Sequence, residues 1–203
     1  MVENDIINIF PTAILSADLG RKITEKELET IKFLLSSPIK NTGNLTSREG
    51  HVFDNPVFSE LKKFCYSKLV DYFKKIISPS TEVDIQITQS WLNSCEPNEF
   101  HHKHNHPNSF LSGVFYISTN ENDCIIFDKD VDNAIVFSVK EYNNWNCNTW
   151  WLPAIEGRLY IFPSSVQHFV EPVVGSKTRI SLSFNSFPKG IIGNETDRTL
   201  LKL

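Results

Sequence analysis

The histidines of this sequence are concentrated where they can bind a metal ion. Four of the six lie in the run HHKHNH at positions 101–106, and a fifth, His168, follows far downstream. In a strand, residues i and i+2 point to the same face, so His104 and His106 can face one interior, and His168 can complete a triangle from another strand. Three imidazoles on one side of an iron, zinc or copper ion leave its opposite positions open, as in the facial sites of non-haem iron proteins.

A histidine-rich tract alone is also typical of a solvated loop that binds metal weakly. The downstream sequence bears on this choice, because the segment 178–185 alternates strictly between apolar and polar residues and places Arg179 and Ser181 on its polar face. An arginine can bind a carboxylate through two parallel hydrogen bonds, and a serine two residues later can add a third. On its own, a strand face with an arginine and serines more often points to solvent. Together with the histidine cluster, it favours an anion site inside the protein.

The first third of the chain reads as helical. Thr24 and Glu27 form a capping box, an apolar stripe follows at helical spacing, and Pro38 ends it. A second helix is predicted to begin at Asn55-Pro56 and to end before Pro79.

From Glu82 onward the pattern changes to short strands separated by turn residues. Strands are predicted at 83–88, 111–118, 124–127, 134–139, 149–152, 158–162, 167–170 and 178–184. Many short strands at even spacing indicate an all-β sandwich or barrel.

Three segments together resemble a known family. They are the run from His104-Asn105-His106 to Tyr116, the stretch Phe162-Pro163-Ser164 leading to His168, and the strand 179–185. This combination resembles a family of 2-oxoglutarate/Fe(II)-dependent oxygenases from bacteria and phages, related to prolyl 4-hydroxylase-like enzymes. The resemblance extends from Trp91 to Asn185, and the N-terminal third matches in outline.

The resemblance implies a mainly β protein, a double-stranded β-helix (jelly roll) with flanking N-terminal α-helices. It implies Fe(II) as cofactor, 2-oxoglutarate and O₂ as co-substrates, and hydroxylation of a primary substrate that the sequence does not identify, with release of succinate and CO₂. His104 and His168 correspond to iron ligands, and Arg179 and Ser181 to the residues that hold the C5 carboxylate of 2-oxoglutarate. Where the wider superfamily has a carboxylate ligand, this chain has His106. Either His106 binds iron itself, which we favour, or a water or anion takes that position.

Further polar and aromatic residues fall on strands expected to line the interior. Asn93 and Tyr116 are predicted either to hydrogen-bond 2-oxoglutarate or to pack in the core, and Trp91 to pack in the core. His101 and His102 are assigned a supporting or substrate-facing role.

Two alternatives remain at this point. A three-histidine jelly roll also fits a cupin-like metal protein that does not use 2-oxoglutarate, or a zinc site. Such a protein needs no Arg179 beyond the distal histidine. A carbohydrate- or protein-binding sandwich with an incidental histidine tract predicts instead that His104, His106 and His168 do not converge.

Composition excludes several other classes. The 203 residues predict one domain, with a helical flank at 1–80, a β core at 82–187 and a tail at 188–203. The net charge is −4 and basic residues are scattered, which argues against nucleic-acid binding. The four cysteines are far apart, and neither a signal peptide nor a membrane span is recognisable, so a cytoplasmic protein with reduced thiols is expected.

Overall fold

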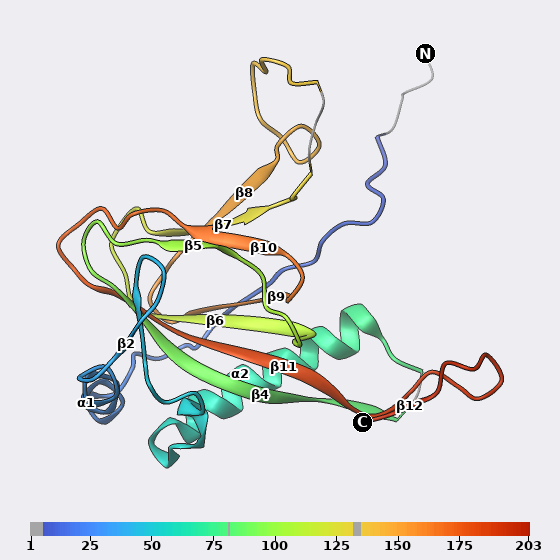
Figure 1. Ribbon diagram of the computed structural model, residues 1–203, viewed down its shortest axis with the longest axis horizontal. Coiled ribbons are helices and arrows are strands. Elements are labelled where there is room, and N and C mark those ends of the chain that lie inside the picture. Colours follow the sequence, from blue (N-terminus) through green and yellow to red (C-terminus); the bar gives the residue numbers. More distant parts are fainter. Residues whose placement is uncertain (1–5, 81, 132–134) are drawn as a thin grey trace.

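The computed structural model describes residues 6–80, 82–131 and 135–203, which are mainly β (Figure 1). The α-helices of these ranges are α1 (Glu25–Leu34) and α2 (Ser59–Tyr72). The strands are β1 (Leu15–Asp18), β2 (Ile39–Lys40), β3 (Leu45–Thr46), β4 (Val83–Cys95), β5 (His101–His104), β6 (Leu111–Ser118), β7 (Cys124–Asp128), β8 (Thr149–Pro153), β9 (Arg158–Pro163), β10 (Gln167–Val170), β11 (Arg179–Ile192) and β12 (Leu201–Lys202).

The strands form two sheets in which the named pairs are antiparallel. The larger sheet has the order β1-β9-β6-β11-β4-β3-β2, with β12 paired to the far part of β11, and the smaller has the order β5-β10-β7-β8. The two sheets lie over one another (Figure 1). Residues of both sheets line a common pocket. This arrangement is the predicted jelly roll, so the expected fold class is confirmed.

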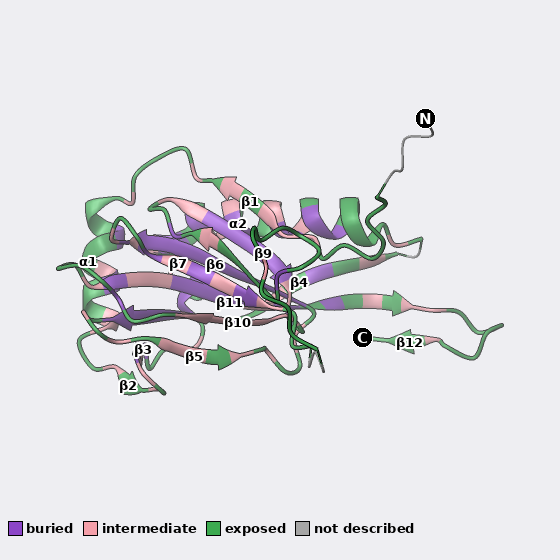
Figure 2. Ribbon diagram, turned by 90° about the horizontal axis from the view of Figure 1, so that it is seen from above, coloured by how far each residue is buried: buried purple, intermediate pink, exposed green. Residues whose placement is uncertain are grey.

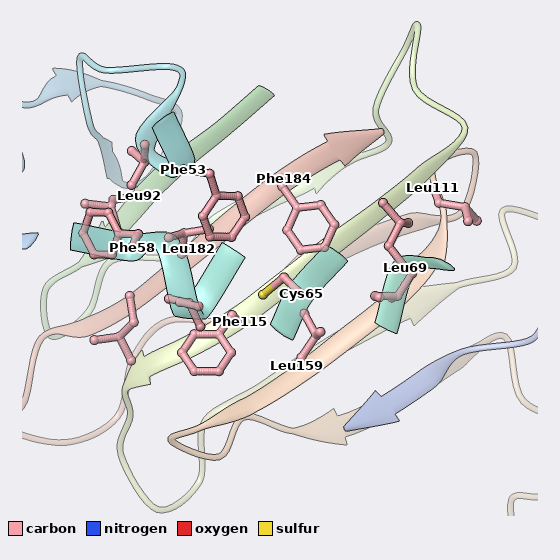
Figure 3. Close-up of a cluster of buried hydrophobic side chains, with 14 of the residues drawn as sticks. Phe53, Phe58, Cys65, Leu69, Leu92, Leu111, Phe115, Leu159, Leu182 and Phe184 are labelled. Atoms are coloured by element: carbon pink, nitrogen blue, oxygen red, sulfur yellow. The ribbon is translucent and has the colours of Figure 1, made fainter. Parts of the chain in front are cut away.

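Helix α2 covers the outer face of the larger sheet (Figure 1). Its residues Leu61, Cys65 and Leu69 are completely buried against apolar side chains of β4, β6, β9 and β11 (Figure 3). Figure 2 shows nearly continuous burial along β6, whereas β11 is buried or half-buried as far as Ser186 and more exposed beyond it. Each large side chain removed from water in this way contributes about 1.5–3 kcal/mol, so the helix and sheet form one rigid support beneath the pocket.

The predicted helix starts are confirmed. The Thr24 hydroxyl accepts a hydrogen bond from the Glu27 backbone N–H (3.2 Å), and the Glu27 carboxylate accepts one from the Thr24 backbone N–H (2.7 Å). At the second helix, Asn55 caps a 3-10 turn at Pro56–Phe58 that leads directly into α2. A π-helical turn then ends at Ser78, whose left-handed backbone (φ 48°) precedes Pro79.

The structure corrects the sequence-based assignment in three places. Of the strand predicted at 134–139, residue 134 lies outside the described residues, and Ile135–Val139 is not a strand because no neighbouring strand pairs with it. The N-terminal part is not only helical, since it also supplies β1, β2 and β3. The segment from 188 onward continues β11 to Ile192 and returns as β12.

Candidate metal and co-substrate site

Three histidines predicted to bind metal lie together on the smaller sheet. His104 of β5 and His168 of β10 are direct cross-strand partners, and His106 follows β5 by two residues. Ring centroids are 4.4 Å apart for His104 and His168, 5.1 Å for His106 and His168, and 5.2 Å for His104 and His106. One ring nitrogen of each lies within 4.8 Å of the other two. The three histidines therefore converge. A carbohydrate- or protein-binding sandwich with an incidental histidine tract would not bring them together.

Each of these rings is oriented through its Nδ1 atom. His104 Nδ1 donates to the backbone carbonyl of His102 (2.7 Å), and His168 Nδ1 donates to that of Val166 (3.0 Å). His106 Nδ1 donates to the side-chain oxygen of Asn185. A neutral imidazole has one N–H, so all three Nε2 lone pairs are left for a common ligand. Such outer hydrogen bonds are the usual means of orienting metal-binding histidines.

The three imidazoles are also held in the neutral form. Burial, together with repulsion from the neighbouring histidines, lowers the pKa of His104 to about 4 and that of His168 to about 3. Burial likewise lowers the pKa of His106. Since only the unprotonated ring nitrogen binds a metal, the apo site is already in the ligand form.

The predicted co-substrate residues form a row on the larger sheet. Ser181 of β11 pairs in register with Asn93 of β4 on one side and with Tyr116 of β6 on the other. Directly opposed residues in a sheet point to the same face. All three line the same pocket as the histidines.

Arg179 stands two residues before Ser181 and is 5% exposed. Its Nη1 lies 3.5 Å from the Asp123 carboxylate, whereas its Nη2 is buried without a hydrogen-bond partner. A buried guanidinium nitrogen is costly to leave unpaired. It is therefore a donor suited to an anion.

The donor set of the pocket fits a metal ion together with a carboxylate ligand. Three Nε2 atoms lie on one side, and the Arg179 guanidinium, the Ser181 hydroxyl and the Tyr116 phenol on the other. Asn93 donates through Nδ2 to the Ser183 hydroxyl (3.0 Å), and its Oδ1 is buried without a partner. If the Asn93 amide rotates by half a turn, its N–H₂ faces the pocket and its Oδ1 accepts a hydrogen bond from the Ser183 hydroxyl. Both ends of the amide are then hydrogen-bonded when an anion, which only accepts hydrogen bonds, is bound in the pocket.

The enclosed volume of the pocket is about 40 Å³. The pocket is therefore narrow, and its walls are formed by the histidines on one side and by residues of β4, β6 and β11 on the other.

The remaining aromatic candidates border the histidines. The Trp91 ring lies 5.6 Å from His106, and the His101 ring stacks on His104 at 4.4 Å. His102 turns its Nδ1 toward the Thr42 carbonyl (3.3 Å) and does not line the pocket.

Two residues of the site were missed by the sequence analysis. Asn185 is the last polar residue of the alternating strand that begins at Arg179, so its position on the inner face was visible but its partner His106 was not. Asp123 lies in the turn before β7, where an acidic residue is ordinary, and nothing in the sequence pairs it with Arg179.

Comparison with known proteins agrees with this geometry. Residues 89–185 match the family model described as "Putative 2OG-Fe(II) oxygenase". The matched segment contains every histidine and polar residue of the site described above. A comparison with curated proteins finds no match.

Solved structures share the fold. A prolyl-4-hydroxylase from Pseudomonas putida is 13% identical, with a TM-score of 0.55, over 86% of this chain and 92% of that one. HygX from Streptomyces hygroscopicus, whose structure contains nickel, 2-oxoglutarate and hygromycin B, is 10% identical, with a TM-score of 0.58, over 86% and 82%. An oxidoreductase of the 2OG-Fe(II) oxygenase family from Burkholderia pseudomallei is 14% identical, with a TM-score of 0.55, over 86% and 83%.

The fold is thus that of the jelly-roll oxygenases. The match over residues 89–185 and the shared fold support a 2-oxoglutarate- and Fe(II)-dependent oxygenase, in agreement with the resemblance seen in the sequence. The matched family uses iron, with 2-oxoglutarate and O₂ as co-substrates. The alternative of a jelly roll that does not use 2-oxoglutarate is not favoured.

Proposed function

We propose that the protein hydroxylates its primary substrate, with Fe(II) bound through Nε2 of His104, His106 and His168. Arg179 and Ser181 hold the C5 carboxylate of 2-oxoglutarate, and Asn93 and Tyr116 hydrogen-bond the same molecule. One observation carries this assignment: three free Nε2 atoms and the unpartnered Arg179 Nη2 line a single pocket.

The bound iron, with 2-oxoglutarate and O₂, supplies the oxidising chemistry, and the products are hydroxylated substrate, succinate and CO₂. The chain supplies binding and orientation. The Asn185, His102 and Val166 oxygens fix the imidazole planes. Arg179 fixes the far end of the dicarboxylate, and the apolar walls around it exclude water.

His106 takes the place of a carboxylate ligand in this assignment. Its Nδ1 is anchored as firmly as those of the other two histidines, which is the reason to prefer direct ligation over a bound water or anion. Three neutral ligands leave the full charge of Fe(II) to be balanced by the co-substrate, so 2-oxoglutarate binding and iron retention are expected to be strongly coupled.

An anaerobic titration with Fe(II) and then 2-oxoglutarate tests the proposal. The wild type should develop the weak visible charge-transfer band of the Fe(II)–2-oxoglutarate complex and should release succinate when substrate and O₂ are added. His168→Ala should lose iron, and Arg179→Ala should keep iron but require far more 2-oxoglutarate. His51→Ala, an exposed histidine outside the pocket, is the matched control. An unchanged band in Arg179→Ala would contradict the assignment.

The location and organisation are proposed on separate grounds. All four cysteines are free thiols, which supports a reducing, cytoplasmic location. Among the described residues, no helix has the length and apolarity to cross a membrane.

The net charge of −4 supports a small-molecule or protein substrate rather than a nucleic acid. Pairing of β1 with β9 and packing of α2 beneath the larger sheet support one domain across 1–203.

A further inference from the structure

A β-bulge lies in the strand that carries the metal-binding histidines. His104 pairs with His168 and His101 pairs with Val170, so three steps along β5 match two steps along β10. An extra residue of this kind breaks the alternation of side chains and re-aims one of them. His101 therefore faces the same side as His104, which a regular strand would forbid at this spacing.

The consequences of the bulge are visible in the contacts. His101 lines the pocket together with Arg179 and Asn93, and its ring stacks on His104 with an interplanar angle of 23°. His102, which simple alternation places inside, instead contacts Thr42.

The hydrogen bond of His101 identifies its free nitrogen. Its Nε2 lies 3.3 Å from Asn41 Nδ2, an amide nitrogen that also donates to Asn44 Oδ1 (2.8 Å). Because an amide N–H₂ only donates, Nε2 is the acceptor and the ring proton is on Nδ1. Asn41 lies between β2 and β3, so this hairpin holds a neutral imidazole with one N–H left to donate.

His101 is not placed to be a metal ligand. His101, His102 and His104 also bring ring nitrogens within 4.8 Å of one another. However, the His101 Nε2 lone pair is occupied by Asn41, and His104 has a single free lone pair, which the His106–His168 group uses. A donor that binds no metal, next to the Arg179 guanidinium, is suited to an anion that accepts hydrogen bonds without donating any.

We propose that His101 is an additional 2-oxoglutarate-binding residue, which donates from Nδ1 to an oxygen of the co-substrate between the iron and Arg179. The inference rests on the proposed function, since it places one more donor on the same dicarboxylate. The Asn41 contact limits how far the ring turns and keeps the Nδ1 proton in place.

Anaerobic binding of Fe(II) and of 2-oxoglutarate to His101→Leu and His101→Gln tests this role. His101→Leu should bind Fe(II) within about twofold of wild type, because no ligand is lost. Its Kd for 2-oxoglutarate, read from the charge-transfer band, should rise about 10- to 100-fold, the size of a lost hydrogen bond to a charged group. His101→Gln, which retains an N–H donor, should recover part of that loss. His51→Leu, at an exposed histidine outside the pocket, should match wild type.

Asn41→Ala keeps the test decisive if His101→Leu does not fold. This variant leaves every pocket side chain in place and removes the hydrogen bond that fixes the His101 tautomer. It should weaken 2-oxoglutarate binding about threefold to tenfold, as for a neutral hydrogen bond of about 1 kcal/mol, without changing Fe(II) affinity.

The outcomes separate this inference from the proposed function. An unchanged 2-oxoglutarate Kd in His101→Leu, or in Asn41→Ala where the first variant does not fold, overturns the role of His101 alone. A loss of Fe(II) affinity in folded His101→Leu overturns it too, by making His101 a ligand. No band in the wild type overturns the proposed function itself.

Discussion

Arg179 Nη1, in the wall of the pocket, lies 3.5 Å from Asp123 Oδ1, and the two side chains are 5% and 3% exposed. Asp123 is itself fixed by the backbone N–H of Asn120, which donates to its other oxygen (2.8 Å). The charges of Arg179 and Asp123 cancel. In the proposed complex, with three neutral histidines, the charges of Fe(II) and of the 2-oxoglutarate dianion would cancel as well. Asp123 would then supply the negative charge that the resemblance leads one to expect at the position of His106.

Asp123→Asn should destabilise the protein, because it leaves a buried guanidinium without its counter-charge. Breaking a buried pair costs about 3–5 kcal/mol, and the long N–O separation here favours the lower end. The free energy of unfolding from urea denaturation measures the loss. The double variant Asp123→Asn/Arg179→Met, which removes both charges, should recover most of it. Equal stability of Asp123→Asn and wild type would show that Arg179 does not depend on this partner.

Asn185→Ala should weaken iron binding although Asn185 is not a ligand. Without the side-chain oxygen, His106 Nδ1 retains the Ser112 hydroxyl at 3.1 Å as its neighbour, and the ring is free to turn. Loss of an orienting partner typically lowers metal affinity about 10- to 100-fold. Competition with a chelator under anaerobic conditions measures the change. Asn105→Ala, which removes an exposed amide beside the same histidine, is the control, and a similar effect in both variants would argue against ring orientation as the cause.

The parts of the fold with local signals were predictable. The capping box of α1 and the strands Leu111–Ser118 and Gln167–Val170 have the bounds that periodicity indicated, because turn residues flank them on both sides. The segment Ile135–Val139 has strong strand propensity but extends from the sheet with side chains such as Val136 86% exposed. Propensity without a neighbouring strand does not form a strand. Pairing of β12 with β11 is equally non-local, and sequence patterns do not record it.

The site was predictable as a set of residues but not as a network. His104, His106, His168 and Arg179 were recognisable from spacing and from resemblance. The bulge that turns His101 inward depends on the register between β5 and β10, and Asp123 reaches Arg179 only once both sheets are assembled. Contacts between elements distant in sequence follow from packing, which single-sequence patterns do not contain.

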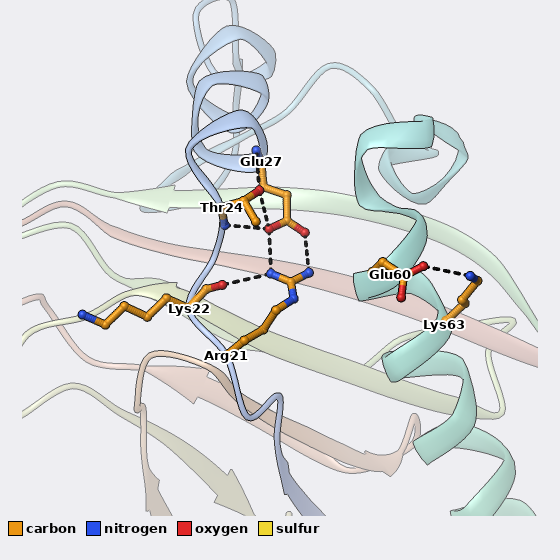
Figure 4. Close-up of polar contacts among 6 residues, drawn as sticks. All are labelled: Arg21, Lys22, Thr24, Glu27, Glu60 and Lys63. Carbon is orange, nitrogen blue, oxygen red and sulfur yellow. Dashed lines mark hydrogen bonds and ion pairs between the residues drawn. The ribbon is translucent and has the colours of Figure 1, made fainter.

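Glu27→Gln should lower stability in a pH-dependent way. Burial opposes ionisation of Glu27, but hydrogen bonds from Arg21 and Thr24 outweigh it and hold the pKa of the carboxyl below its ordinary value of 4.5 (Figure 4). A lowered folded-state pKa stabilises the protein above pH 4.5, and this contribution disappears as the pH falls through the folded pKa. The variant should therefore unfold about 1–2 kcal/mol more easily at pH 7, and the difference should shrink in acid.

Urea denaturation of both proteins across pH 3 to 7, a range of about four units around the carboxylate pKa, measures this trend. Glu60→Gln, which removes an exposed partner of Lys63 (2.8 Å), is the control and should change little at any pH. A Glu27→Gln effect that grew as the pH fell would contradict the assigned direction of the pKa shift.

Gly113→Ala should destabilise the β core beneath the site. Gly113 of β6 lies opposite Phe184 of β11, and a Cβ atom at position 113 would come within 2.1 Å of the Phe184 ring, inside the cluster drawn in Figure 3. The ring is completely buried, so it cannot move aside without disturbing its neighbours. Overpacking of this kind costs about 1–3 kcal/mol. In a Phe184→Leu background, the smaller side chain leaves room, and the same substitution should cost clearly less in the free energy of unfolding. If Gly113→Ala cost the same in both backgrounds, its effect would come from the strand backbone and not from contact with the ring.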